Sequence, residues 1–310
     1  MEQLTKCLAC NSTRFNPFVQ TTAMMHPHTP ELFQFDQCTN CQLVFLNPRV
    51  PEPDLSQYYT DAYLPYRVEE AWGKYARFVK QDQKKVDGLR VKRVLQHHQL
   101  SPDSRILDVG CGKPTFLTAL RETCRSQLFG IDFSDNGWAN DLQKYEGIQL
   151  KKGEIADLRG EAPMDVITMW HYLEHDYRPQ EHLRQLLDNA HEETRLIVEV
   201  PNFDSYTRRR FGAKWSGYHT PRHTALYSPK NIKTLLENSG WQAETILTHG
   251  TLDPYTLHWM SRMEQKGIDW TASMEPRFVG YVAGMVLHAP IYLLHKLFSL
   301  GFMTAVARPK

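Results

Sequence analysis

Two pairs of cysteines near the start of the sequence have the spacing of metal ligands. Cys7 and Cys10 form one Cys-x-x-Cys pair, and Cys38 and Cys41 form a second pair after 27 intervening residues. This arrangement is typical of four thiolates around one tetrahedral zinc ion rather than of a disulfide framework, with iron or free thiols as the alternatives. Because four thiolates leave no position open for water, we expect a structural and not a catalytic metal. So small a segment also has too small a hydrophobic core to fold without a metal ion or a cross-link.

A second candidate for chemistry is a glycine turn that follows a short apolar run. The run 105–109 predicts a buried strand, and Gly110 and Gly112 remove side chains where backbone must approach a ligand. Pro114 suits the first turn of a following helix. The positive end of that helix could meet a cofactor carboxylate. The segment therefore predicts a loop that binds a nucleotide cofactor.

Two acidic residues narrow the choice of cofactor. A nicotinamide-binding loop would have an apolar residue at position 108 and glycine at 115, but this chain has Asp108 and Thr115. An acid at position 108 can instead face a cation. Asp132 ends the next predicted strand, 128–132, twenty residues after Gly112. At that spacing an acid reaches the two hydroxyls of a ribose.

The segment 107–112 resembles motif I of the class I S-adenosylmethionine-dependent methyltransferases. Three later segments follow in the family's order: 153–158 resembles the adenine-lining segment, 164–175 the strand and loop with the Leu-Glu-His signature, and 195–202 the fifth strand. Pro114 departs from the pattern, because the family usually has glycine there. The resemblance implies an α/β fold with a Rossmann-like seven-stranded sheet whose last strand is antiparallel. It also implies a set of cofactor-binding residues, namely Asp108, Gly110, Cys111, Gly112, Asp132, Phe133, Glu154, Ile155, Asp157 and Trp170.

The cysteine-rich segment and the core together resemble the ubiquinone O-methyltransferase-like group and some zinc-containing sugar C-methyltransferases. In such proteins the segment before the core folds over the cofactor as a lid. This implies that Tyr58, Tyr59 or Tyr63 covers the cofactor, and we take Tyr59 as a cofactor contact. Packing of these rings between ribbon and core is the alternative. The expected units are a zinc ribbon at 1–50, a lid and leading helix at 51–100, and a methyltransferase core at 101–310 with a helical insertion at about 249–300.

The substrate side should lie after the fifth strand, because open α/β sheets bind ligands at the carboxyl ends of their strands. The segment 215–223 there concentrates aromatic side chains, two histidines and an arginine. Methyl transfer to a hydroxyl or an enolisable carbon needs a base that works near pH 7. We take His223 as the first candidate base, His219 and His171 as alternatives, and Tyr218 as a residue that orients the acceptor. For each histidine, a hydrogen-bonded packing role is the other interpretation.

The remaining elements follow from apolar spacing. We expect an amphipathic helix over 69–99, a helix over 228–238, and the sixth and seventh strands at 240–248 and 302–308. The segment 278–295 has no formally charged side chain, but Pro290 and His288 interrupt it. It falls short of a membrane span. We expect a helix or helix pair that packs on the core, lines a hydrophobic channel, or uses 278–300 to dimerise or to contact a membrane surface.

Composition limits the function classes. The 310 residues carry a formal net charge of +1, which gives no argument for nucleic acid, and we expect no secretory signal and a cytoplasmic protein. We therefore predict transfer of a methyl group from S-adenosylmethionine to an oxygen or carbon of a small molecule. The apolar insertion is compatible with a hydrophobic acceptor. The alternatives are a nicotinamide-dependent oxidoreductase, a nucleic-acid methyltransferase and a non-catalytic Rossmann-like scaffold.

Overall fold

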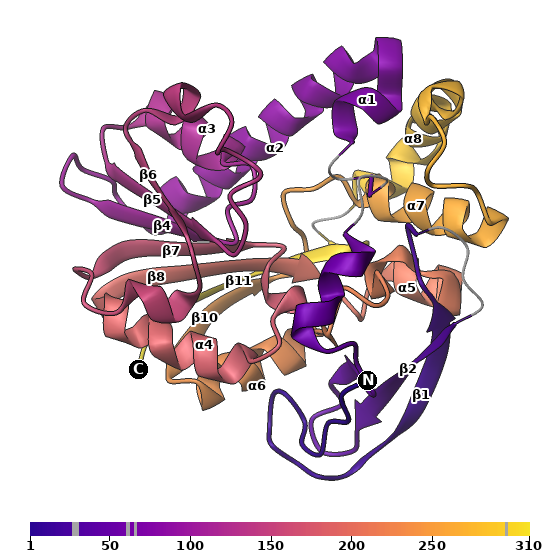
Figure 1. Ribbon diagram of the computed structural model, residues 1–310, viewed down its shortest axis with the longest axis horizontal. Coiled ribbons are helices and arrows are strands. Elements are labelled where there is room, and N and C mark those ends of the chain that lie inside the picture. Colours follow the sequence, from indigo (N-terminus) through magenta and orange to yellow (C-terminus); the bar gives the residue numbers. More distant parts are fainter. Residues whose placement is uncertain (27–30, 60–62, 65–66, 295–296) are drawn as a thin grey trace.

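The computed structural model describes residues 1–310 apart from 27–30, 60–62, 65–66 and 295–296. Its larger part is a seven-stranded sheet in the order β10-β11-β8-β7-β4-β5-β6 (Figure 1). Strands β8, β7, β4, β5 and β6 are parallel, and β11 lies antiparallel between β8 and β10. This confirms the predicted Rossmann-like sheet with an antiparallel last strand. The strands are β4 (Arg105–Val109), β5 (Gln127–Asp132), β6 (Ile148–Lys152), β7 (Met164–Trp170), β8 (Ala190–Pro201), β10 (Trp241–Leu247) and β11 (Phe302–Pro309).

Helices cover both faces of this sheet (Figure 1). In β4, Ile106 belongs to the apolar cluster that includes side chains of α2 and α3, whereas Leu107 and Val109 belong to the cluster that includes side chains of α4 and α6. Both faces are therefore buried, which explains why this strand is a nearly continuous apolar run. The loops that follow β4, β5 and β7 meet at one edge of the sheet. The helices are α2 (Ala76–His97), α3 (Thr115–Thr123), α4 (Pro179–Gln185) and α6 (Pro229–Asn238).

The cysteine-rich segment forms a second sheet in the order β1-β2-β3-β9. Strands β1 (Phe15–Thr22), β2 (Leu32–Cys38) and β3 (Val44–Leu46) come from the N-terminal segment, but β9 (Ala225–Leu226) comes from far along the chain. Strand β9 pairs with β3 and follows directly after the histidines of the predicted acceptor loop. The N-terminal sheet is therefore built onto that loop.

The predicted helix over 69–99 is interrupted. Helix α1 (Val68–Trp72) ends at Gly73, whose φ of 49° breaks the helix before α2 begins. Trp72 and Val86 are buried as expected, but Leu89 is 49% exposed. The three-to-four-residue spacing therefore overestimated both the length of the helix and the width of its apolar face.

The insertion before β11 contains α7 (Pro254–Lys266) and α8 (Phe278–Tyr292). The short helix α5 (Tyr206–Phe211) lies earlier, directly after β8. One side of α8 packs on aromatic side chains, with Phe278 stacked on Tyr75 at 4.0 Å between ring centroids. The other side faces outward, at the periphery of the molecule (Figure 1). No helix in the described part of the chain is both long and apolar enough to cross a membrane. Contact of 278–300 with a membrane surface or a second copy stays a prediction. The exposed apolar side chains of this region are Val279, Val286, Leu287, Ile291, Leu293, Leu294, Leu297 and Phe298.

Candidate functional site

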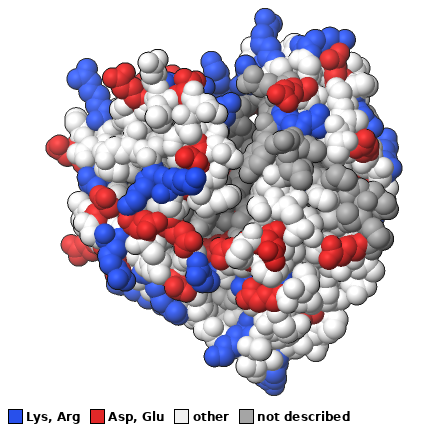
Figure 2. Space-filling view, viewed as in Figure 1, with Lys and Arg blue, Asp and Glu red and all other residues white. Residues whose placement is uncertain are grey.

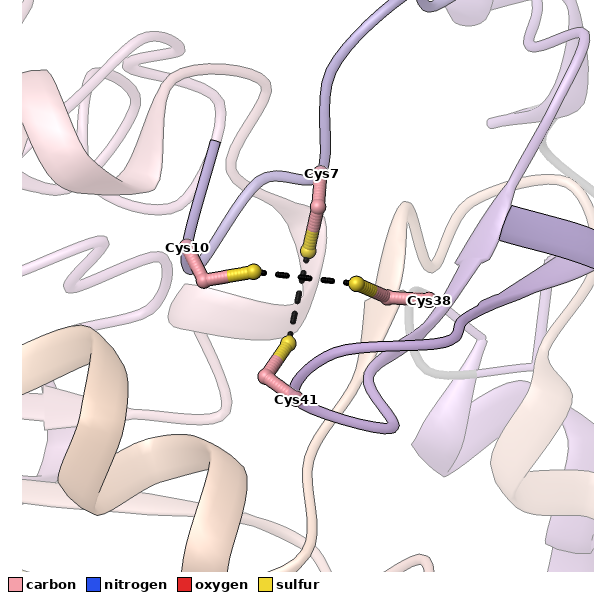
Figure 3. Close-up of side chains that lie close together, drawn as sticks. All are labelled: Cys7, Cys10, Cys38 and Cys41. Carbon is pink, nitrogen blue, oxygen red and sulfur yellow. Dashed lines mark hydrogen bonds between the residues drawn. The ribbon is translucent and has the colours of Figure 1, made fainter. Parts of the chain in front are cut away.

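The four cysteines of the N-terminal pairs converge on one point (Figure 3). The Sγ atoms of Cys7 and Cys41 are 3.5 Å apart, those of Cys10 and Cys38 are 3.6 Å apart, and all four lie within 4.8 Å of one another. A disulfide would need about 2.05 Å. Thiolates around a tetrahedral zinc ion at about 2.3 Å lie roughly 3.8 Å from each other. The donor set and its spacing therefore fit a tetrahedral zinc ion.

Hydrogen bonds attach this cysteine cluster to helices of the large sheet. Asn231 of α6 donates to the carbonyl oxygen of Cys41, and Gln180 of α4 donates to that of Ala9 at 2.6 Å. Asn238 donates to the same Ala9 oxygen at 2.9 Å. The candidate metal site thus connects the N-terminal sheet to the helices of the large sheet and is not part of an independent module.

The glycine loop is fixed to the neighbouring strand by backbone amides. Gly110 has a φ of 71° and donates to the carbonyl oxygen of Ile131 at 2.8 Å. Gly112, with a φ of 47°, donates to Oδ2 of Asp132 at 2.9 Å. The other oxygen of Asp132 accepts from the amide of Ser134 at 3.0 Å. Asp132 therefore holds the loops after β4 and β5 together at the edge of the sheet where a cofactor would bind.

Asp108 is buried below this loop. Its Oδ1 accepts a 2.6 Å hydrogen bond from the hydroxyl of Thr168. Burial raises the pKa of Asp108 to about 7, although the Thr168 hydrogen bond and the charge of Arg90 lower it. A cationic ligand would favour the ionised form of this carboxyl. Arg90 of α2 was not among the site residues expected from the sequence.

Three neighbouring side chains complete the region around the loop. Cys111 is a packing residue, because it belongs to the buried cluster between β4, β5 and α3 and burial raises the pKa of its thiol. Trp170 is buried against Phe116, and its Nε1 has no hydrogen-bond partner among the described residues. Phe133 is 67% exposed. An unpartnered buried donor and an exposed ring are both features that a bound cofactor would satisfy.

The ring of Tyr172 lies directly over Gly110. A Cβ placed on Gly110 would come within 2.4 Å of this ring, so the glycine makes the contact possible. Burial raises the pKa of the Tyr172 hydroxyl well above its usual range, with the charges of Asp176 and Asp132 adding to the effect. Tyr172 thus occupies the space above the glycine loop.

The predicted adenine segment forms a short capped turn. The side chain of Asp157 accepts from the amide of Glu154 at 2.8 Å, and the Glu154 carboxylate lies 3.3 Å from Arg178. Ile155 is buried in the core. Glu154 and Asp157 are both exposed. On the face shown in Figure 2, a hollow separates the lobe with α3 from the lobe with α8, and acidic side chains gather along its lower edge.

Histidines of the Leu-Glu-His segment and of the acceptor loop form a cluster. Ligand atoms of Glu174, His175 and His223 lie within 4.8 Å of one another. The His219 ring centroid is 4.8 Å from that of His223, and Nε2 of His219 is buried without a partner in the described residues. The hydroxyl of Tyr59 lies 3.1 Å from Nδ1 of His175, so the predicted lid tyrosine contacts this cluster. The Leu-Glu-His signature was visible in the sequence, but its two polar residues were not taken as site residues.

The histidines differ in charge. The ring of His171 lies between two carboxylates. Its Nδ1 is 3.3 Å from Oε1 of Glu174, and its Nε2 is 3.1 Å from Oε1 of Glu199. Burial lowers its pKa, but the two carboxylates outweigh burial and raise the pKa of His171 to about 9. Burial holds the pKa of His219 and of His223 well below the usual range. An imidazolium cannot accept a proton, so His219 and His223 are better suited than His171 to act as a base.

Tyr218 lies away from this chemistry. It is 2% exposed, and its ring packs 5.1 Å from Phe35 and 5.5 Å from Trp215 between centroids. This places Tyr218 in the core between the acceptor loop and the N-terminal sheet. A direct role in orienting an acceptor therefore has no support from its position.

Comparisons with known proteins agree on one family. A sequence model described as "Methyltransferase domain" matches residues 76–246. Demethylmenaquinone methyltransferase from Bacillus cereus is 37% identical over 73 residues, which cover 23% of this chain and 30% of that protein. Magnesium protoporphyrin IX methyltransferase from Synechocystis PCC 6803, solved with SAH, is similar in fold, with a TM-score of 0.51 and 11% identity over 83% of this chain and 96% of that chain. A methyltransferase solved with the Haloferax volcanii activator Trm112 gives a TM-score of 0.50 and 15% identity, covering 74% and 94% of the two chains.

Proposed function

Because the chain belongs to the methyltransferase-domain family and is an S-adenosylmethionine-dependent methyltransferase, we propose that its acceptor is a small molecule methylated on oxygen or carbon. The observation that carries this proposal is the pair of buried imidazoles, His219 and His223, close to the segment that covers the glycine loop. Tyr172 contacts that loop, and Glu174 of the histidine cluster follows two residues later. Two residues span at most about 7 Å of chain. This chain connection supports the proposal that the imidazoles lie near the methyl donor.

For the cofactor, we propose that the glycine loop and its neighbours hold S-adenosylmethionine, which supplies a methyl group on a sulfonium. Asp108 would face the ammonium group, and the unpartnered Nε1 of Trp170 would donate to the carboxylate. Asp132 would bind the ribose, and Phe133 would cover the adenine. Glu154 would meet the polar edge of the base.

We further propose that the four cysteines hold a structural zinc ion and that the acceptor is apolar. Leu287 of α8 is 76% exposed, and other apolar side chains of this helix are exposed as well. They support an acceptor that is apolar or that enters from an apolar environment. The local match to an enzyme named for demethylmenaquinone supports the same class. The charges in Figure 2 are interspersed, which favours a small molecule over a nucleic acid.

Asp132→Ala is expected to weaken binding of S-adenosylhomocysteine about 10- to 100-fold, because the variant removes charge-assisted hydrogen bonds to the ribose. Isothermal titration calorimetry of the metal-replete chain measures this loss. Asp135→Ala is the matched control, since Asp135 is an exposed acid three residues later that pairs with Lys152 at 3.0 Å. Equal affinities in the two variants would contradict the proposed cofactor site.

His219→Ala and His223→Ala are each expected to lower kcat about 100- to 10,000-fold, because the acceptor then loses the group that removes its proton or holds its oxygen. Affinity for S-adenosylhomocysteine should stay within about twofold. The control is His191→Ala, which removes a half-exposed imidazole that bonds Asp165 at 3.2 Å. Steady-state assays on a panel of phenols, quinols and sugars measure the effect. Full activity in both cluster variants would place the base elsewhere.

A further inference from the structure

Glu174, His175 and His223 have the chemistry of a second metal site, separate from the four cysteines. Their ligand atoms lie within 4.8 Å of one another. Ligand atoms of one tetrahedral zinc ion, at 2.0–2.2 Å from it, lie roughly 3.4 Å apart. Side-chain rotations that bring the three atoms closer together would therefore place them around one ion.

Hydrogen bonds orient both imidazoles, and that of His223 is held in a tautomer that can bind a metal. Nδ1 of His223 lies 2.8 Å from the carbonyl oxygen of Gly217, and Nδ1 of His175 lies 3.1 Å from that of Arg222. A carbonyl oxygen only accepts, so Nδ1 of His223 carries the proton and its Nε2 keeps a lone pair. Nδ1 of His175 also lies 3.1 Å from the Tyr59 hydroxyl, which can donate or accept. Metal-binding histidines are oriented by this kind of hydrogen bond.

The carboxylate lacks the partner that a cation would provide. Glu174 is 1% exposed, and its Oε2 has no hydrogen-bond partner among the described residues. Its Oε1 faces the ring of His171, which Glu199 contacts from the other side. A buried carboxylate oxygen is costly when it is unpaired. His171 and Glu199 thus orient Glu174 and leave one oxygen free for an ion.

The two segments that carry the ligands are fixed to each other. The amide of Thr224 donates to the carbonyl oxygen of Glu174 at 2.7 Å, and its hydroxyl donates to that of Asp176 at 2.7 Å. The guanidinium of Arg222 is turned away, toward the carbonyl oxygens of Tyr58 and Met24. Hydrogen bonds therefore hold the two ligand-bearing segments together, and the guanidinium of Arg222 does not point at the site.

We propose that Glu174, His175 and His223 bind one divalent transition-metal ion of the zinc, iron(II) or manganese class, and that its open positions take an oxygen of the methyl acceptor. Two histidines and one carboxylate leave positions free for water or substrate, unlike four thiolates. The role toward the acceptor rests on the proposed function. In it, the acceptor hydroxyl gives its proton to Nε2 of His219. The oxygen then bonds to the methyl carbon as the carbon–sulfur bond breaks and leaves its electron pair on sulfur.

The test is metal content by mass spectrometry after dialysis of the full chain against Zn²⁺, Mn²⁺ or anaerobic Fe²⁺. Wild type is expected to hold about two ions per chain, and Glu174→Gln and His175→Ala about one. His171→Gln should keep the second ion with about 10- to 100-fold lower affinity, because it loosens Glu174. His191→Ala, the matched control, should hold the same number as wild type.

Retained cysteine-bound metal and S-adenosylhomocysteine binding would show that each variant is folded. If Glu174→Gln does not fold, His175→Ala decides, since that ring is partly exposed. One ion per chain in wild type with every metal, or two in both ligand variants, would overturn the site. Loss of the second ion without any change in methyl transfer would keep the metal site and overturn its role toward the acceptor.

Discussion

Cys38→Ser is expected to release the metal of the four-cysteine cluster and to unfold the N-terminal sheet. In small zinc modules, the bound ion contributes roughly 10–16 kcal/mol, which is comparable to the whole stability of a domain, about 5–15 kcal/mol. Here the ion would link residues on both sides of β1 and β2. Zinc content and thermal unfolding measure the effect. The control is Cys124→Ser, which changes a half-buried thiol that donates to the Leu120 carbonyl oxygen at 3.3 Å and should cost no more than about 1 kcal/mol.

The loss should extend beyond the N-terminal sheet. Strand β9 pairs with β3 directly after the histidine loop, and Asn231 and Gln180 bond the backbone of the cysteine segment. Release of the metal should therefore loosen His219 and His223, and methyl transfer should fall together with the sheet. A variant without zinc that keeps both the wild-type Tm and full activity would contradict this coupling.

Local chemistry explains which parts of the fold were predictable. Gly110, Gly112 and the buried run before them form strand and turn through their own sequence, and the prediction for them needed no distant partner. The cysteine cluster was equally predictable, because two Cys-x-x-Cys pairs at this spacing are typical of one four-thiolate metal site. Strand β9 has only two residues, Ala225 and Leu226, and exists because β3 offers it an edge. No window of sequence contains that information.

The candidate site also contains residues that local sequence places and properties that depend on tertiary contacts. Asp108 and Asp132 lie at the carboxyl ends of β4 and β5, and Phe133 follows β5 directly, so their places at one end of the sheet were predictable from the sequence. The charge of His171 was not, because it depends on Glu199, a residue 28 positions away on β8. Which histidine is neutral is a question of tertiary contacts, since burial and neighbouring carboxylates move a pKa in opposite directions.

Glu199→Gln is expected to destabilise the fold by about 3–5 kcal/mol, because it leaves the His171 imidazolium facing a neutral amide in a buried place. Glu199 is fully buried and accepts hydrogen bonds from His171, from the amide and hydroxyl of Thr251, and from Thr304. Burial would raise its pKa, but the hydrogen bond and charge of His171 hold the pKa of Glu199 at about 2. Urea unfolding at pH 7 measures the loss.

The control for this variant is Glu244→Gln, which has the same change of shape and charge at a partly exposed position. Glu244 pairs with Arg195 at 3.1 Å and Arg308 at 3.3 Å, and such surface pairs contribute about 0–1 kcal/mol. A loss for Glu199→Gln as small as the control's would mean that His171 is neutral in the native chain. The stability of one buried variant thus tests whether the His171–Glu199 pair is ionised.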